Sequence, residues 1–255
     1  MSPLSRARIL LVEDDPSIAR FVGMALDVFD VDLTTCSTVA EALQVLQPDA
    51  FRLIITDLML PGESGEQLIQ RLQADPGLAG AAPIAVYSAG LNPEVRQRLT
   101  ALGAWRILSK PTPLNELEDC VRDALALTAG RVGAAETRPA EPPMSKPAAT
   151  NDLSAAEEDA IATHFAGDAT LFKAYRASCH AQFRNDVLAG DAAVAAADWP
   201  ALRRLAHSLK TVLLTLGRPH ESSLARQLED DAEAQAIPSC RAGWQMLRIG
   251  LQASE

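Results

Sequence analysis

A chain of 255 residues, 48% of them hydrophobic, is long enough for two domains of ordinary size and can bury real cores. Its net charge of −10 argues against nucleic acid as a main partner, because phosphate backbones bind basic surfaces. The N-terminus resembles neither a signal peptide nor an anchor, and no apolar run approaches the roughly 18 residues of a membrane helix. We therefore expect a cytoplasmic protein without membrane insertion.

The first half of the chain alternates short apolar runs with stretches of helical periodicity. Strands are expected at Arg8–Val12, Val31–Thr35, Leu53–Thr56, Ile84–Tyr87 and Arg106–Leu108. Helical stretches lie near 17–28, 38–47, 64–74, 93–102 and 114–127. Five strands alternating with five helices predict an α/β domain over residues 1–128. Its core would be a five-stranded, parallel, doubly wound sheet.

Composition changes after this domain. Residues 129–152 are rich in Pro and Ala and have no apolar periodicity, and four prolines there oppose a stable helix. We expect a flexible linker, with an r.m.s. span of roughly 25–30 Å.

The β pattern is missing from residues 153–255, which predict an all-α domain. Helices are expected near 154–165, 169–189, 199–216, 221–236 and 239–250. Asp168 and Asp198 are candidate N-caps, and Gly190 and Gly217 are candidate helix stops. The four cysteines form no CxxC pair, which argues against a zinc site and favours reduced thiols.

Three carboxylates are expected at one edge of the predicted sheet. Asp14 and Asp15 follow the first strand, and Asp57 ends the third. The carboxyl ends of parallel strands share an edge, and ligands bind there. Anions this close need a counterion, and Mg²⁺ prefers a few carboxylates together with water and phosphate oxygens.

Two further residues belong to the same edge. Ser88 ends the fourth strand and Lys110 follows the fifth. A metal, an ammonium group and a hydroxyl around one carboxylate are the parts needed to transfer a phosphoryl group to it. Asp57 would then be the in-line nucleophile.

These motifs, in this order, resemble the receiver domains of two-component response regulators over roughly residues 6–128. The resemblance implies a flavodoxin-like fold, phosphorylation of Asp57, and Ser88 and Lys110 contacting the phosphoryl group. It implies Mg²⁺ binding by Asp14, Asp15, Asp57 and the backbone carbonyl of Met59. One position departs from the family, because Ile107 stands where an aromatic switch residue is usual, and Trp105 lies two residues earlier.

The second domain carries a histidine on an amphipathic helix. A core stripe is formed by Leu202, Leu205, Leu209, Val212, Leu213 and Leu216. His207 lies off that stripe, and its neighbours one turn away are Arg203, Arg204, Lys210 and Thr211. We expect an exposed imidazole among cations, which is a suitable nucleophile near neutral pH, with cations that could hold phosphoryl oxygens.

The stretch Ala206–Thr211 resembles the active helix of histidine-containing phosphotransfer (HPt) domains, which are four-helix bundles. The resemblance covers roughly residues 153–250. It implies that His207 accepts a phosphoryl group from a receiver aspartate, can pass it on, and is assisted by Lys210. Thr211 departs from the family, which favours a glycine there.

Together these features predict a phosphorelay signalling protein. It would not be an enzyme beyond the receiver's own phosphorylation and dephosphorylation. Expected partners are a sensor histidine kinase or hybrid kinase, and other receiver domains that dock on the His207 face. The direction of phosphate flow stays open, as does exchange between Asp57 and His207 within one chain. Two alternatives are a module that binds and inhibits a kinase without being phosphorylated, and a bundle that dephosphorylates a partner's receiver.

Overall fold

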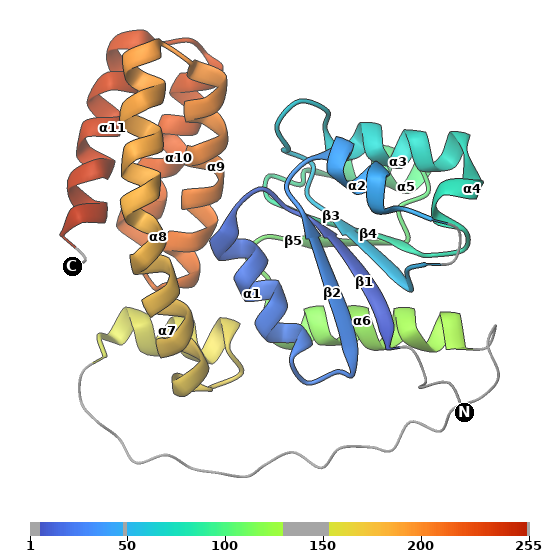
Figure 1. The fold of residues 1–255 in the computed structure, drawn as a ribbon. Coiled ribbons are helices and arrows are strands. Elements are labelled where there is room, and N and C mark those ends of the chain that lie inside the picture. Colours follow the sequence, from blue (N-terminus) through green and yellow to red (C-terminus); the bar gives the residue numbers. More distant parts are fainter. Residues whose placement is uncertain (1–5, 48–49, 130–152, 254–255) are drawn as a thin grey trace.

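The computed structural model describes residues 6–47, 50–129 and 153–253, which form an α/β domain and a helical domain (Figure 1). All of the predicted linker except Ala129 lies outside the described residues.

The first domain is built on one five-stranded sheet, as predicted. Its strands are β1 (Ala7–Val12), β2 (Val31–Cys36), β3 (Leu53–Thr56), β4 (Ile84–Ser88) and β5 (Arg106–Ser109). All pairings are parallel and the order is β2-β1-β3-β4-β5, so β1 and β3 are neighbours at the centre. Residues 9–12 and 53–55 are fully buried, which is why both runs are apolar at consecutive positions.

Helices cover both faces of this sheet (Figure 1). One face packs against α1 (Pro16–Leu26) and α6 (Leu114–Ala129). The other packs against α2 (Val39–Val45), α3 (Gly65–Ala74) and α5 (Pro93–Ala101), with the short α4 (Pro76–Ala79) following α3.

The second domain begins with α7 (Ala155–His164). The helices α8 (Ala169–Ala196), α9 (Trp199–Thr215), α10 (Pro219–Glu233) and α11 (Ile237–Gln252) then pack side by side as a bundle (Figure 1). Asp168 and Asp198 accept hydrogen bonds from backbone amides at the starts of α8 and α9, which confirms both predicted caps. Gly217 has a φ of 72° just after α9, which confirms that stop.

Gly190 does not end a helix, and that prediction was wrong. It lies inside α8, where a Cβ would be 2.1 Å from ring atoms of Trp244 on α11. The glycine therefore makes room for an indole between two helices, and α8 continues to Ala196.

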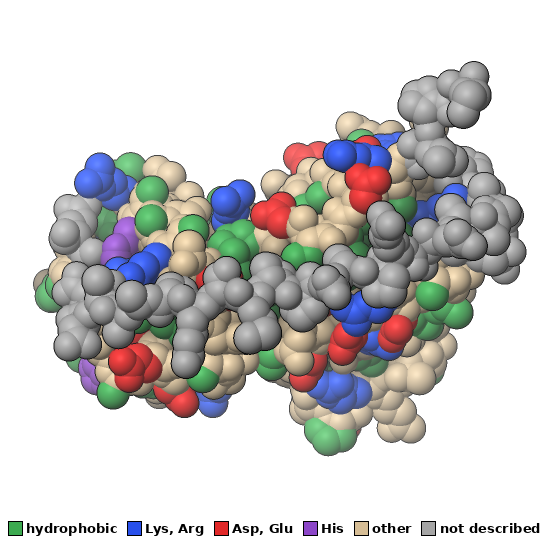
Figure 2. Space-filling model, turned by 90° about the horizontal axis from the view of Figure 1, so that it is seen from below, with side chains coloured by type: hydrophobic (Ala, Val, Ile, Leu, Met, Phe, Trp, Pro, Cys, Tyr) green, Lys and Arg blue, Asp and Glu red, His purple; other side chains and the backbone are tan. Residues whose placement is uncertain are grey.

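The two domains touch through α1, which packs against α8 and α9 (Figure 1). The buried apolar residues of both domains form one continuous cluster there. On the face seen in Figure 2, basic side chains are interspersed with acidic ones over the described surface. Among the described helices, none is both long and apolar enough to cross a membrane.

Candidate functional site

Asp57 lies at the carboxyl end of β3, at the centre of the sheet. Its backbone amide donates to the carbonyl of Val12 at 2.9 Å, and its Oδ1 accepts from the amide of Leu58 at 2.6 Å. The side chain is almost completely buried. Gly65, the first residue of α3, approaches so closely that a Cβ would lie 1.8 Å from the Asp57 carbonyl oxygen. Gly65 was not singled out from the sequence, and it lets α3 start directly against the site.

The carboxylates brought together differ by one residue from the predicted set. Glu13, Asp14 and Asp57 each offer a carboxylate oxygen, and these atoms lie within 4.8 Å of one another. Asp15 instead caps α1, because its Oδ1 accepts from the amides of Ser17 and Ile18 at 2.8 and 2.9 Å. An aspartate directly before Pro16 is a common helix-start pattern, and Glu13 is the first residue after β1. The position of Asp15 before a proline and that of Glu13 after the strand could have shown from the sequence that Asp15 caps the helix and Glu13 joins the carboxylate cluster.

Lys110 supplies the cation of this cluster. Its buried Nζ donates to Asp57 Oδ2 at 2.9 Å and also to Glu13. Burial alone would raise the pKa of Asp57. The charges of Lys110 and His207, with hydrogen bonds from Ser88 and Lys110, outweigh burial and lower it. Asp57 is therefore held ionised, as a nucleophile must be.

The other two acids are short of positive charge. Burial, and then the charge of Asp57, raises the pKa of Asp14 to about 6. Burial also raises the pKa of Glu13 well above its usual range, although Lys110 opposes this. The single ammonium group of Lys110 thus faces three carboxylates and cannot neutralise all of them. An all-oxygen donor set with surplus negative charge fits a hard divalent cation such as Mg²⁺.

The remaining predicted residues of the first domain lie nearby. Ser88 is buried at the end of β4, and Met59 is partly buried two residues after Asp57. Ile107 is partly buried in β5, and its carbonyl accepts from Arg96 at 3.3 Å. Trp105 lies before β5, with the Arg106 guanidinium 4.7 Å from its ring centroid.

His207 on α9 is held by a carboxylate that the sequence analysis missed. Its Nδ1 lies 2.7 Å from Glu229 Oε1 on α10, and Lys210 donates to the other oxygen of Glu229. Burial opposes ionisation of Glu229, but hydrogen bonds and charge from His207 and Lys210 lower its pKa to about 2. An ionised carboxylate only accepts hydrogen bonds, so Nδ1 must donate. In the neutral ring, Nε2 then carries the free lone pair.

The Nε2 atom is buried and has no hydrogen-bond partner among the described residues. The His207 side chain is 6% exposed, whereas the sequence predicted an exposed side chain. The first domain accounts for this difference, because its strand ends face α9 and the charge of His207 acts on Asp57. Thr211, one turn further along α9, is also buried, and its hydroxyl has no partner in the described part of the chain.

Two cavities lie between the domains. One of about 310 Å³ is lined by Asp14, Asp15 and Pro16 of the first domain and by Gln182, Asp186, Ala201, Arg204, Leu205 and Ser208 of the second. The other, of about 430 Å³, is lined by Ala89, Gly90, Lys110 and Pro111 and by Lys210, Thr211, Leu214, Arg226, Glu229 and Asp230. Both are open to solvent, and charged side chains from both domains line them.

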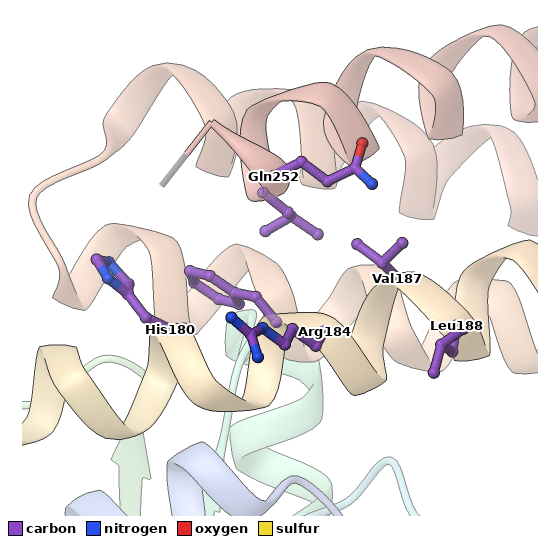
Figure 3. Close-up of a pocket in the computed structure, with 7 residues that line it drawn as sticks. His180, Arg184, Val187, Leu188 and Gln252 are labelled. Atoms are coloured by element: carbon purple, nitrogen blue, oxygen red, sulfur yellow. The ribbon is translucent and has the colours of Figure 1, made fainter. Parts of the chain in front are cut away.

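The other three histidines lie on α7, α8 and α10. His180 lines a separate cavity between α8 and α11, where Arg184, Val187 and Leu188 of α8 lie opposite Gln252 (Figure 3). Among the described residues no carboxylate lines that cavity, but His180 also lines a neighbouring one together with Glu157 and Glu221. His164 is buried at the end of α7, and His220 is exposed in the first turn of α10.

Two family models match the chain: the response regulator receiver domain over residues 9–122, and the Hpt domain over residues 172–255. The response regulator receiver protein CpdR of Brucella abortus is 33% identical over 111 residues, which cover 43% of this chain and 89% of CpdR. The response regulator protein PilR of Pseudomonas aeruginosa is 34% identical over 124 residues, or 49% of this chain and 27% of PilR. The chain thus spans about a quarter of the first curated relatives it matches.

One relative matches both domains. The virulence sensor protein BvgS of Bordetella pertussis is 26% identical over 243 residues, or 93% of this chain and 19% of BvgS. Among solved structures, the chemotaxis response regulator CheY4 of Vibrio cholerae matches with 26% identity and a TM-score of 0.42, covering 48% of this chain and all of CheY4.

Receiver and Hpt domains are phosphotransfer modules of two-component signalling, and their presence in one chain indicates a phosphorelay protein. The chain belongs to the response regulator receiver family and joins a receiver domain to an Hpt domain.

Proposed function

We propose that Asp57 accepts a phosphoryl group in a Mg²⁺-dependent reaction and that His207 carries one, so that the chain passes phosphate between two-component partners. Those partners are a sensor histidine kinase or hybrid kinase, and receiver domains that dock on the His207 face. The observation that carries the proposal is the pair of nucleophiles: an ionised Asp57 beside Lys110, and an imidazole whose Nε2 has no partner.

At Asp57 the reaction is an in-line displacement. A carboxylate oxygen forms the new O–P bond as the bond between phosphorus and the donor breaks. Lys110 neutralises charge on the phosphoryl oxygens, and Ser88 donates a hydrogen bond to them. Glu13, Asp14 and Asp57 would hold Mg²⁺, which would supply further positive charge at those oxygens.

At His207 the same group is carried on nitrogen. Nε2 forms an N–P bond as the O–P bond of an aspartyl phosphate breaks, and the carboxylate leaves with the bonding electrons. The proton on Nδ1 stays in its hydrogen bond to Glu229, so no proton needs to be removed for the attack.

The test is labelling with isotopic acetyl phosphate and Mg²⁺. Asp57→Asn should abolish all label, because the small donor acts through the receiver. His207→Gln should keep an acyl phosphate, which alkali removes, and lose the acid-labile, alkali-stable phosphohistidine. Label that survives in the double variant Asp57→Asn/His207→Gln would contradict the proposal.

A further inference from the structure

The interface between the domains has an aromatic core. The Phe21 ring of α1 lies 5.5 Å from Phe165, which follows α7, and 5.5 Å from Tyr175 of α8. Phe165 also contacts Phe172 at 5.4 Å between ring centroids. All four rings are at most 3% exposed. Edge-on aromatic pairs with this degree of burial are typical of an interior or a stable interface.

Polar contacts extend this interface between the domains toward His207 and the carboxylate cluster. Ser208, the residue after His207, hydrogen-bonds the side chain of Asp15 at the start of α1. Ser17, in the first turn of α1, hydrogen-bonds Cys179 of α8, and both are buried. These contacts fix α9 over the carboxyl edge of the sheet. This places His207 where it can lower the pKa of Asp57.

The two domains are covalently connected, which favours their pairing within one molecule. Residues 130–152 separate the described ends of α6 and the second domain, a tether of 23 residues. Because both domains belong to one chain and few residues separate them, each meets the other at an effective concentration of about 1 mM.

We propose that the second domain is the docking partner of its own receiver, and that phosphoryl groups pass between Asp57 and His207 within one molecule. This inference rests on the proposed function and names its first partner. In the step, the Asp57 O–P bond breaks and the His207 Nε2–P bond forms, which regenerates the carboxylate. Reversal returns the group to Asp57, so the paired domains share one phosphoryl group. External receivers must displace α1 of the same chain to reach His207.

Two full-length variants separate transfer within a chain from transfer between chains. His207→Gln can only be phosphorylated on Asp57, and Asp57→Asn offers only His207. The wild type and an equimolar mixture of these variants are labelled with acetyl phosphate and Mg²⁺ over a range of protein concentrations.

In the wild type, phosphohistidine should form with a rate constant that is independent of protein concentration. In the mixture the rate should rise with concentration, and at about 1 μM it should be slower by about a thousandfold. Equal concentration dependence in both samples would overturn the inference and leave the proposed function standing. Phosphohistidine in neither sample would overturn both.

Interface variants test the docking surface itself. Phe21→Ala should leave labelling of Asp57 unchanged and slow transfer to His207 by about tenfold or more, since aromatic contact and burial are lost. The matched control is Val28→Ala, just beyond α1, which removes an apolar side chain that is 67% exposed. Tyr175→Ala makes the same test from the other domain and leaves the receiver sequence intact. Unchanged transfer in both aromatic variants would overturn the proposed interface.

Discussion

Two adjacent aspartates have different surroundings, and we expect this difference to decide which of them holds a cation. Asp14 faces Glu13 and Asp57, whereas Asp15 turns its carboxylate to the amides of α1. A carboxylate that accepts two backbone hydrogen bonds has less capacity left for a metal.

We predict that Mg²⁺ raises the melting temperature of the wild type at neutral pH, equivalent to about 2–3 kcal/mol at a hundredfold excess over Kd. Asp14→Asn should remove this response, because it takes away a ligand charge. Asp15→Asn should keep it, because asparagine caps helices as well as aspartate does. Thermal unfolding with and without Mg²⁺ measures both. The account of the cluster fails if Asp15→Asn, rather than Asp14→Asn, abolishes the response.

The second residue-scale prediction concerns Glu229. Glu229→Gln removes the ionised acceptor that fixes the proton on Nδ1, so a fraction of the rings should carry it on Nε2. Transfer to His207 should slow by about tenfold to a hundredfold, with Asp57 labelling unchanged. The control is Glu233→Gln on the same helix, which breaks only the more exposed ion pair with Arg203. A Glu229→Gln variant as fast as this control would show that the tautomer does not matter.

A third prediction concerns pH. Asp186 on α8 is buried, and burial, with the charge of Asp15 adding to it, raises its pKa to about 7 despite a hydrogen bond from Gln182. A carboxyl whose pKa is raised on folding favours the folded state when protonated. Its contribution is fully present below about pH 4 and is lost as the pH rises through about 7.

Asp186→Asn should therefore raise the stability above about pH 8 by on the order of 2 kcal/mol relative to wild type, with a smaller change near pH 5. Denaturant unfolding at both pH values measures this, with the exposed Asp27→Asn as control. An equal change in the free energy of unfolding at the two pH values would show that the pKa of Asp186 is not raised in the folded protein.

At the scale of elements, the packing of α8 against α11 depends on one glycine. The Trp244 indole lies over Gly190 and donates from Nε1 to Asp191 at 2.9 Å. Gly190→Ala should destabilise the second domain by about 1–3 kcal/mol, because a methyl group cannot fit under the ring. Gly23→Ala in α1 is the control, because the added Cβ would meet only Leu33, at 3.8 Å. This substitution should stabilise the protein by a few tenths to about 1 kcal/mol. Chemical denaturation of both variants checks the opposite signs.

The elements were predictable where one local pattern determines them. The strands β1, β3 and β4 follow from consecutive buried residues, and the caps at Asp168 and Asp198 follow from residue type. Gly190 was misread because a stop and a packing glycine look alike until Trp244 is placed 54 residues later. Glu229 was missed for the same reason, since only the pairing of α9 with α10 brings it to His207. Local sequence patterns predict helices and strands, whereas the partners of individual side chains depend on contacts between elements far apart in the sequence.

At the scale of the whole molecule, the two domains form one buried junction. The sequence predicted the kind of fold of each domain. The burial of His207 could not be foreseen, because the covering surface belongs to the other domain. Phe21 reads as an ordinary core residue of α1, and only the placement of Phe165 and Tyr175 makes it part of an interface. Control of this junction would decide whether phosphate stays in the chain or leaves it.

The most direct test of phosphate carriage is phosphorus NMR of the wild-type chain during reaction with acetyl phosphate and Mg²⁺. The account predicts two protein resonances, an aspartyl phosphate followed by a phosphohistidine, with the second absent in His207→Gln and both absent in Asp57→Asn. Slow consumption of acetyl phosphate without either resonance, in a sample that is folded and saturated with Mg²⁺, would contradict it.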